Sequence, residues 1–156
     1  MNHKILKYIT LLAISTKLYA VTPEMVSAVA FVESSNNTSA IGDNGKALGL
    51  YQLHKEAWEQ VSEQRRNNGQ PVYSWRVYAH HRNISTEYAT SYLKWISKRL
   101  EIKLKRKPLP WEVYASYNCG LTAFIRMNCK FENLPKTTQR ACLKIAKLTR
   151  SSIQHQ

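Results

Sequence analysis

One carboxyl group in the chain is a candidate for acid–base chemistry, the side chain of Glu33. It follows Val29 by four residues and Val32 by one, so it projects beside the apolar face of a predicted helix. A carboxyl group in that position is partly desolvated, which raises its pKa and keeps it protonated near neutral pH. A protonated carboxylic acid can serve as a general acid. On position alone, however, a solvent-exposed glutamate at a helix end is the more common interpretation.

The sequence around this candidate contains three short motifs in a characteristic order. They are V-E-S-S-N-N at residues 32–37, G-L-Y-Q at 49–52 and A-S-Y-N-C-G at 115–120. Together they resemble the lysozyme-like lytic transglycosylase family, and the resemblance covers roughly residues 23–123. It implies a lysozyme-like fold and an enzyme that breaks the β-1,4 bond between N-acetylmuramic acid (MurNAc) and N-acetylglucosamine (GlcNAc) in peptidoglycan glycan strands.

The resemblance also implies a role for each matching residue. Ser34 matches the residue beside the catalytic acid, and Gln52 matches the polar residue of the strand that lines the cleft. Tyr51 replaces the methionine that is common in the family, an aromatic change that is tolerable against a sugar face. Tyr117 and Asn118 match the helix end that faces the catalytic carboxyl and the sugar at the cleavage point.

Glu33 matches the catalytic acid of the family. Cleavage of a glycosidic bond needs a proton donor for the leaving oxygen and stabilisation of an oxocarbenium-like transition state. In lytic transglycosylases one glutamate acts as acid and then as base, activating the sugar's own 6-hydroxyl and leaving a 1,6-anhydro end. One carboxylate is enough for this chemistry, which suits a chain with only 10 acidic residues. We expect no cofactor and no metal.

Asp43 opens an alternative. The run from Gly42 to His54 also resembles invertebrate-type lysozymes, in which an aspartate of this loop assists hydrolysis by water. Asp43 follows Glu33 by ten residues, so a hydrolytic muramidase that uses both carboxylates is the second hypothesis. The simpler interpretation, which we favour, is that Asp43 caps a turn flanked by glycines.

The charge of the chain is strongly asymmetric. Lys and Arg number 23 against 10 acidic residues, a net charge of +13. Residues 21–93 carry 6 basic and 7 acidic groups, whereas residues 94–156 carry 14 basic and 3 acidic groups. Such a field favours an anionic partner, either a wall polymer or a membrane surface, and we do not expect nucleic acid. A third hypothesis is therefore a non-catalytic, cationic wall-binding protein.

Residues 1–20 have the layout of a secretory signal peptide. Lys4 and Lys7 precede an apolar run from Tyr8 to Ile14, and Ala20 is a small residue before the predicted cut, although Leu18 is a poor match to the usual cleavage pattern. We therefore expect a protein exported to the periplasm or the exterior. The resemblance implies that the remaining residues, 21–156, form a lysozyme-like transglycosylase domain, which we expect to be a monomer.

The mature chain is long enough for one domain, and its periodicity is mainly helical. We expect helices near residues 23–35, 55–67, 85–105 and 111–118, and a last helix after Pro135 that buries Ala141, Ile145 and Leu148. Residues 48–53 are expected to form one strand of a hairpin, and residues 70–83 a long loop. The fold class is mainly α (α+β, lysozyme-like), a single helical domain with a small β-hairpin beside the active-site cleft.

Three cysteines lie in the last 40 residues, at Cys119, Cys129 and Cys142. Export makes one disulfide plausible, and both Cys129–Cys142 and Cys119–Cys129 are open as pairings. Their spacing does not match a zinc site.

Overall fold

The computed structural model describes residues 21–150, and the predicted signal peptide, residues 1–20, lies outside them. The helices are α1 (Pro23–Ser34), α2 (Lys55–Asn67), α3 (Trp75–Tyr78), α4 (Arg82–Leu104), α5 (Pro110–Cys119), α6 (Leu121–Arg126) and α7 (Lys136–Leu148). The strands are β1 (Ile41–Gly42), β2 (Ala47–Leu48) and β3 (Leu53–His54), and short 3-10 helices cover Asp43–Gly45 and Phe131–Asn133. This mainly helical architecture with a small sheet confirms the predicted fold class.

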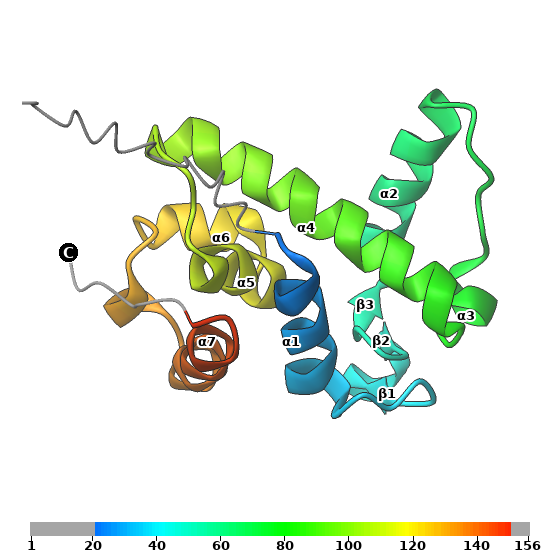
Figure 1. The fold of residues 1–156 in the computed structure, drawn as a ribbon, viewed down its shortest axis with the longest axis horizontal. Coiled ribbons are helices and arrows are strands. Elements are labelled where there is room, and N and C mark those ends of the chain that lie inside the picture. The colour runs from blue at the N-terminus through cyan, green and yellow to red at the C-terminus, as the bar shows by residue number, and fades with distance from the viewer. Residues whose placement is uncertain (1–20, 151–156) are drawn as a thin grey trace, which may run out of the picture.

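The long helix α4 carries two groups of elements on its two halves (Figure 1). Helices α5 and α6 lie beside one half, with α7 packed on α5, whereas α2, α3 and the sheet lie beside the other half, and α1 stands between the two groups. The α4 residues Leu93, Ile96 and Leu100 are fully buried in the shared core. Because α1 joins the two groups, its C-terminal end reaches the boundary between them.

Helix α1 begins and ends as its sequence predicts. The Thr22 hydroxyl accepts a hydrogen bond from the Met25 amide at 3.2 Å, and Pro23 occupies the first helical position. Met25 and Val29 are fully buried, which anchors the apolar face. At the other end, Ser35 adopts a left-handed conformation and its amide bonds back to the helix carbonyls, so the helix ends at Ser34. Glu33 therefore lies in the last turn.

The sheet is larger than the predicted hairpin. Three short antiparallel strands pair in the order β1-β2-β3, with Ile41 opposite Leu48 and Ala47 opposite His54. The prediction of one strand over residues 48–53 was wrong, because the chain reverses between Leu48 and Leu53. Gly49 and Gln52 both have positive φ in that turn, at 71° and 48°, and such backbone cannot continue a strand.

Three other expectations need correction. The predicted loop at 70–83 contains α3, held by the Trp75 indole, which donates to the Leu53 carbonyl at 2.9 Å. Helix α6 was not predicted. On α7 the buried residues are Thr138, Cys142, Ile145 and Ala146, and Leu148 is 45% exposed because it falls outside that stripe.

All three cysteines are free thiols in the structure. Cys142 is fully buried, and burial raises its pKa to about 12, so it is an unreactive core residue. The Cys119 thiol donates to the Ala115 carbonyl at 2.9 Å. The expected disulfide is therefore absent from the described residues.

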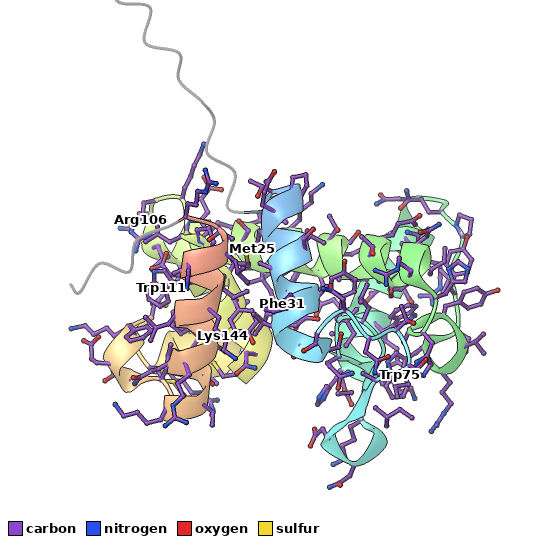
Figure 2. The ribbon with its side chains drawn as sticks, turned by 60° about the horizontal axis from the view of Figure 1, so that its bottom comes forward. Met25, Phe31, Trp75, Arg106, Trp111 and Lys144 are labelled. Atoms are coloured by element: carbon purple, nitrogen blue, oxygen red, sulfur yellow. The ribbon has the colours of Figure 1, made fainter. Side chains whose placement is uncertain are left out.

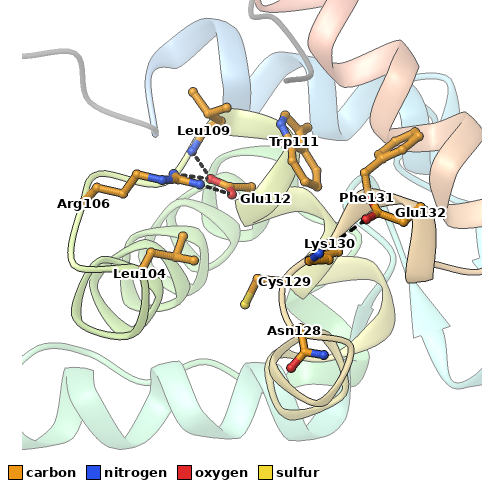
Figure 3. Close-up of a pocket in the computed structure, with 10 residues that line it drawn as sticks. All are labelled: Leu104, Arg106, Leu109, Trp111, Glu112, Asn128, Cys129, Lys130, Phe131 and Glu132. Carbon is orange, nitrogen blue, oxygen red and sulfur yellow. Dashed lines mark hydrogen bonds and ion pairs between the residues drawn. The ribbon is translucent and has the colours of Figure 1, made fainter. Parts of the chain in front are cut away.

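A second buried carboxylate, Glu112, has a structural role (Figure 3). Arg106 donates to both of its oxygens, at 2.7 and 2.9 Å, and the Leu109 amide donates at 2.6 Å. These bonds attach the connection after α4 to the start of α5. Because the Arg106 guanidinium and the Leu109 amide engage both carboxylate oxygens, Glu112 has a structural role in joining these two segments.

Within residues 21–150, no helix has the length and apolar character needed to cross a membrane.

Candidate active site

A surface pocket of about 340 Å³ opens where α1, α5 and the sheet meet. It is lined by Glu33, Asp43, Ala47, Gln52, His54, Tyr117 and Asn118. A second hollow of similar volume shares four of these residues and extends past α2 and α4 to Glu56, Tyr92 and Cys119. Because the two hollows share these four residues, they form one continuous groove, with Glu33 in its wall.

The carboxyl group of Glu33 in this groove is both desolvated and hydrogen-bonded. The Tyr114 hydroxyl donates to Glu33 Oε1 at 2.8 Å. Burial raises the pKa of Glu33 above its usual value of 4.5, and hydrogen bonds from Tyr114 and Asn118 oppose the shift without cancelling it. The Glu33 carboxyl therefore keeps its proton to a higher pH than an exposed glutamate does, and the Tyr114 hydroxyl is in place to donate to its ionised form.

Tyr114 is a site residue that the sequence analysis missed. It is only 1% exposed, and burial, followed by the negative charge of Glu33, raises the pKa of its phenol. The phenol therefore remains a donor at any physiological pH. The signal that could have found it is helical spacing, since Tyr114 precedes Tyr117 and Asn118 by three and four residues on α5.

Tyr117 and Asn118 both line the pocket from the end of α5, as the resemblance implied. The Tyr117 hydroxyl donates to the Tyr51 carbonyl at 2.5 Å, and this bond connects α5 with the turn between β2 and β3. Burial raises the pKa of Tyr117 well above the usual value, so it too remains a donor. Contact of these two residues with a sugar stays a prediction.

Gln52 lines the pocket and also supports its own turn. Its side-chain amide donates to the carbonyl of Gly49 at 2.9 Å and to that of Ala40 at 3.3 Å. Ser34, in contrast, does not line the pocket. Its hydroxyl donates to the Leu50 carbonyl at 2.7 Å, so it attaches the end of α1 to the turn between β2 and β3.

Tyr51 does not line the pocket that holds Glu33, and its expected contact with a sugar stays a prediction. Its ring is 3% exposed, and its hydroxyl is 3.1 Å from that of Thr86 on α4. The ring lines a different hollow, between the start of α1 and α4. The physical reason is the tight turn after Gly49, which directs successive side chains to opposite sides.

Asp43 faces the same pocket as Glu33 and has a partner there. Its Oδ2 lies 3.4 Å from His54 Nε2, and both side chains are about half exposed. Turn formation uses the Asp43 carbonyl, which accepts from the Lys46 amide at 3.1 Å, rather than the carboxylate. His54 was not predicted as a site residue, and only the pairing of β2 with β3 brings it to the groove.

No group of three His, Cys, Asp or Glu side chains within residues 21–150 could hold a metal ion.

A mainly helical domain with a desolvated glutamate in an open groove is the arrangement expected of a lysozyme-like enzyme that cleaves glycosidic bonds. A family model described as Transglycosylase SLT domain matches residues 11–139. The chain belongs to this lysozyme-like family of lytic transglycosylases, which cleave glycosidic bonds in peptidoglycan. Comparisons with curated proteins and with solved structures give no significant match.

Proposed function

We propose that this lytic transglycosylase is exported and breaks the MurNAc-β-1,4-GlcNAc bond with Glu33 as the only acid–base group. The observation that carries the proposal is the environment of Glu33, a carboxyl group whose pKa is raised by burial and whose oxygen accepts from Tyr114 at 2.8 Å in the wall of the groove.

The two steps use the same carboxyl group. Protonated Glu33 gives its proton to the glycosidic oxygen as the bond from that oxygen to C1 of MurNAc breaks, and the GlcNAc side leaves as an alcohol. The carboxylate that remains accepts a hydrogen bond from the Tyr114 hydroxyl, and the Asn118 side chain also favours its ionised form, since it lowers the pKa of Glu33. It then takes the proton of the MurNAc 6-hydroxyl while O6 bonds to C1, which forms the 1,6-anhydro ring and restores protonated Glu33.

Mass spectrometry of the soluble products tests this outcome directly. Digestion of purified peptidoglycan by the mature chain should release muropeptides about 18 mass units lighter than the hydrolysed forms, without reducing ends. Ordinary reducing MurNAc ends would contradict the proposal, because they require water as the nucleophile.

The second candidate function is hydrolysis assisted by Asp43, which the shared pocket of Glu33 and Asp43 favours. A second carboxylate in a glycosidase site can direct a water molecule onto the sugar. If the wild-type products carry reducing ends, Asp43→Asn should abolish their formation. If the products are 1,6-anhydro forms and Asp43→Asn leaves their yield unchanged, Asp43 is structural.

The pH dependence of cleavage follows from the raised pKa of Glu33. The active form of Glu33 is protonated, so kcat/KM should fall as the pH rises through the pKa of Glu33 in the folded protein. Because burial places this pKa above 4.5, the alkaline limb of the profile should lie above that of an exposed glutamate. A profile that declines with an apparent pKa at or below 4.5 would contradict the assignment of Glu33 as the acid.

Export rests on the predicted signal peptide at residues 1–20, and it places the enzyme in the periplasm or outside the cell. Both locations give access to peptidoglycan.

We also infer that the outer face of α7 holds the enzyme on anionic wall polymers. This face exposes Lys136, Arg140, Lys144 and Lys147, and no acidic residue follows Glu132 in the sequence. Helix α1 packs beside α7 and exposes an apolar side chain, Phe31, which is 50% exposed. Figure 2 shows Phe31 on α1 and Lys144 on the adjacent α7. A cationic surface with apolar neighbours can bind an anionic polymer while the groove remains free.

Cosedimentation with intact sacculi tests this surface. Binding should weaken several-fold between about 50 and 500 mM salt, because salt screens contacts between exposed charges. Replacing Arg140, Lys144 and Lys147 by glutamine should remove most of this salt-sensitive binding. A control variant replaces the exposed Lys55 on α2 and the exposed Arg76 on α3 by glutamine, and it should keep the salt-sensitive binding. Binding that is insensitive to salt would contradict the inference.

A further inference from the structure

A buried hydroxyl on α7 is hydrogen-bonded to a residue of the candidate active site without lining the pocket itself. Thr138 is 4% exposed, and its Oγ1 donates a hydrogen bond to Asn118 Oδ1 at 2.8 Å. Asn118 lines the pocket that holds Glu33, whereas Thr138 is not among the residues that line it. Thr138 therefore contacts the site only through Asn118.

This hydrogen bond determines which end of the Asn118 amide faces the groove. A side-chain amide has an accepting oxygen and a donating nitrogen on opposite sides. Because Thr138 engages the oxygen, the nitrogen is the end left for Glu33. In agreement, hydrogen bonding from the Asn118 side chain lowers the pKa of Glu33, as a donor does and an acceptor does not.

We propose that Thr138 is a positioning residue for the reaction, because its hydroxyl holds Asn118 with Nδ2 toward the Glu33 carboxyl. The inference rests on the proposed role of Glu33 and extends it to α7. Once Glu33 has given up its proton, the carboxylate needs donors, and a rotated amide would present an oxygen to it instead. Thr138 prevents that rotation without contacting the substrate.

The packing of α7 makes this support rigid. The helix packs against both α5, which carries Asn118, and α1, which carries Glu33. The hydroxyl is thus on a helix that packs against the two helices carrying the amide and the carboxyl, and the Tyr114–Glu33 hydrogen bond joins those two helices. A donor fixed before the reaction stabilises developing charge without reorganisation.

The test compares Thr138→Val, which keeps the shape and removes the hydroxyl, with Thr138→Ser, which keeps the hydroxyl. Thr138→Val should lower kcat by about tenfold with little change in KM, and it should move the alkaline limb of the kcat/KM profile to higher pH. Thr138→Ser should recover most of the loss. The adjacent Thr137 is exposed, so Thr137→Val is the matched control and should behave as wild type.

A second measurement does not depend on activity. NMR titration of the 13C-labelled Glu33 carboxyl should give a higher pKa in Thr138→Val than in wild type or Thr138→Ser, because a donor to the carboxylate is lost. In an Asn118→Ala background, Thr138→Val should cause no further shift. If Thr138→Val does not fold, Thr138→Ala supplies a second variant without the hydroxyl.

The outcomes separate this inference from the proposed function. Full activity of Glu33→Gln would overturn the proposed function, whatever Thr138 does. If Glu33 is essential but Thr138→Val keeps the wild-type pH profile and the wild-type pKa of Glu33, the positioning role is overturned. A shift that persists in the Asn118→Ala background would also overturn it, since Thr138 would then act by another route.

Discussion

Replacing Glu33 by glutamine is expected to reduce cleavage of peptidoglycan by at least about 10²–10⁴-fold, which is the usual contribution of a positioned general acid. Glutamine has nearly the same shape and can still accept the hydrogen bond from Tyr114, but it has no proton to give to the glycosidic oxygen. The measurement is the release of soluble muropeptides at the pH optimum. The matched control is Glu24→Gln, which changes an exposed glutamate in the first turn of the same helix and should keep wild-type activity.

The stability of Glu33→Gln shows whether a loss of activity comes from the missing proton donor or from unfolding. Because the pKa of Glu33 is raised in the folded state, its stabilising contribution is complete below the unfolded pKa and is lost as the pH rises through the folded pKa. At neutral pH the neutral glutamine should therefore be as stable as glutamate or more stable. Wall clearance at full rate by Glu33→Gln, together with its loss on neutralising α7, would support the cationic-binding hypothesis instead.

Replacing Gly49 by alanine should cause a large loss of stability. Gly49 has φ of +71°, and an added Cβ would come within 1.8 Å of the Ala79 carbonyl oxygen, which is backbone and cannot move freely. The left-handed conformation costs roughly 1–2 kcal/mol for an L side chain, and the overlap adds roughly 1–3 kcal/mol. We expect the free energy of unfolding, measured with urea, to fall by about 2–5 kcal/mol.

The activity of Gly49→Ala should fall along with its stability, because the turn after Gly49 carries Leu50 and Gln52. The Leu50 carbonyl holds Ser34 beside Glu33, and Gln52 lines the pocket. The matched control is Gly69→Ala at the end of α2, where φ is +66° but no atom lies within 4 Å of the added Cβ. This variant should lose only about 1–2 kcal/mol, the cost of the left-handed conformation alone. Equal losses in the two variants would show that contact with Ala79 is unimportant.

Most of the helices could be predicted because their signals are local in the sequence. The Thr22 cap, Pro23 and the apolar spacing up to Val32 placed α1 and put Glu33 in its last turn, and α2 was predicted with its observed bounds, Lys55–Asn67. Each of these signals involves residues no more than about four positions apart, the distance over which a helix makes its own hydrogen bonds.

The sheet was predicted less well for the same physical reason. Strands of two residues leave almost no alternation to read, and the reversal between Leu48 and Leu53 depends on the conformations of Gly49 and Gln52. The direction of Tyr51 follows from that turn, so its burial against α4 could not be inferred from the motif that contains it.

The sequence by itself determined the helical fold class, the motifs of the family and Glu33 as the candidate acid. Only the tertiary structure decided the groups around that acid. Tyr114 donates to Glu33 across 81 residues of sequence, His54 meets Asp43 through strand pairing, and Thr138 reaches Asn118 from another helix. Such contacts depend on how the helices and strands pack against one another, because residues distant in sequence meet only once their shared apolar faces are buried.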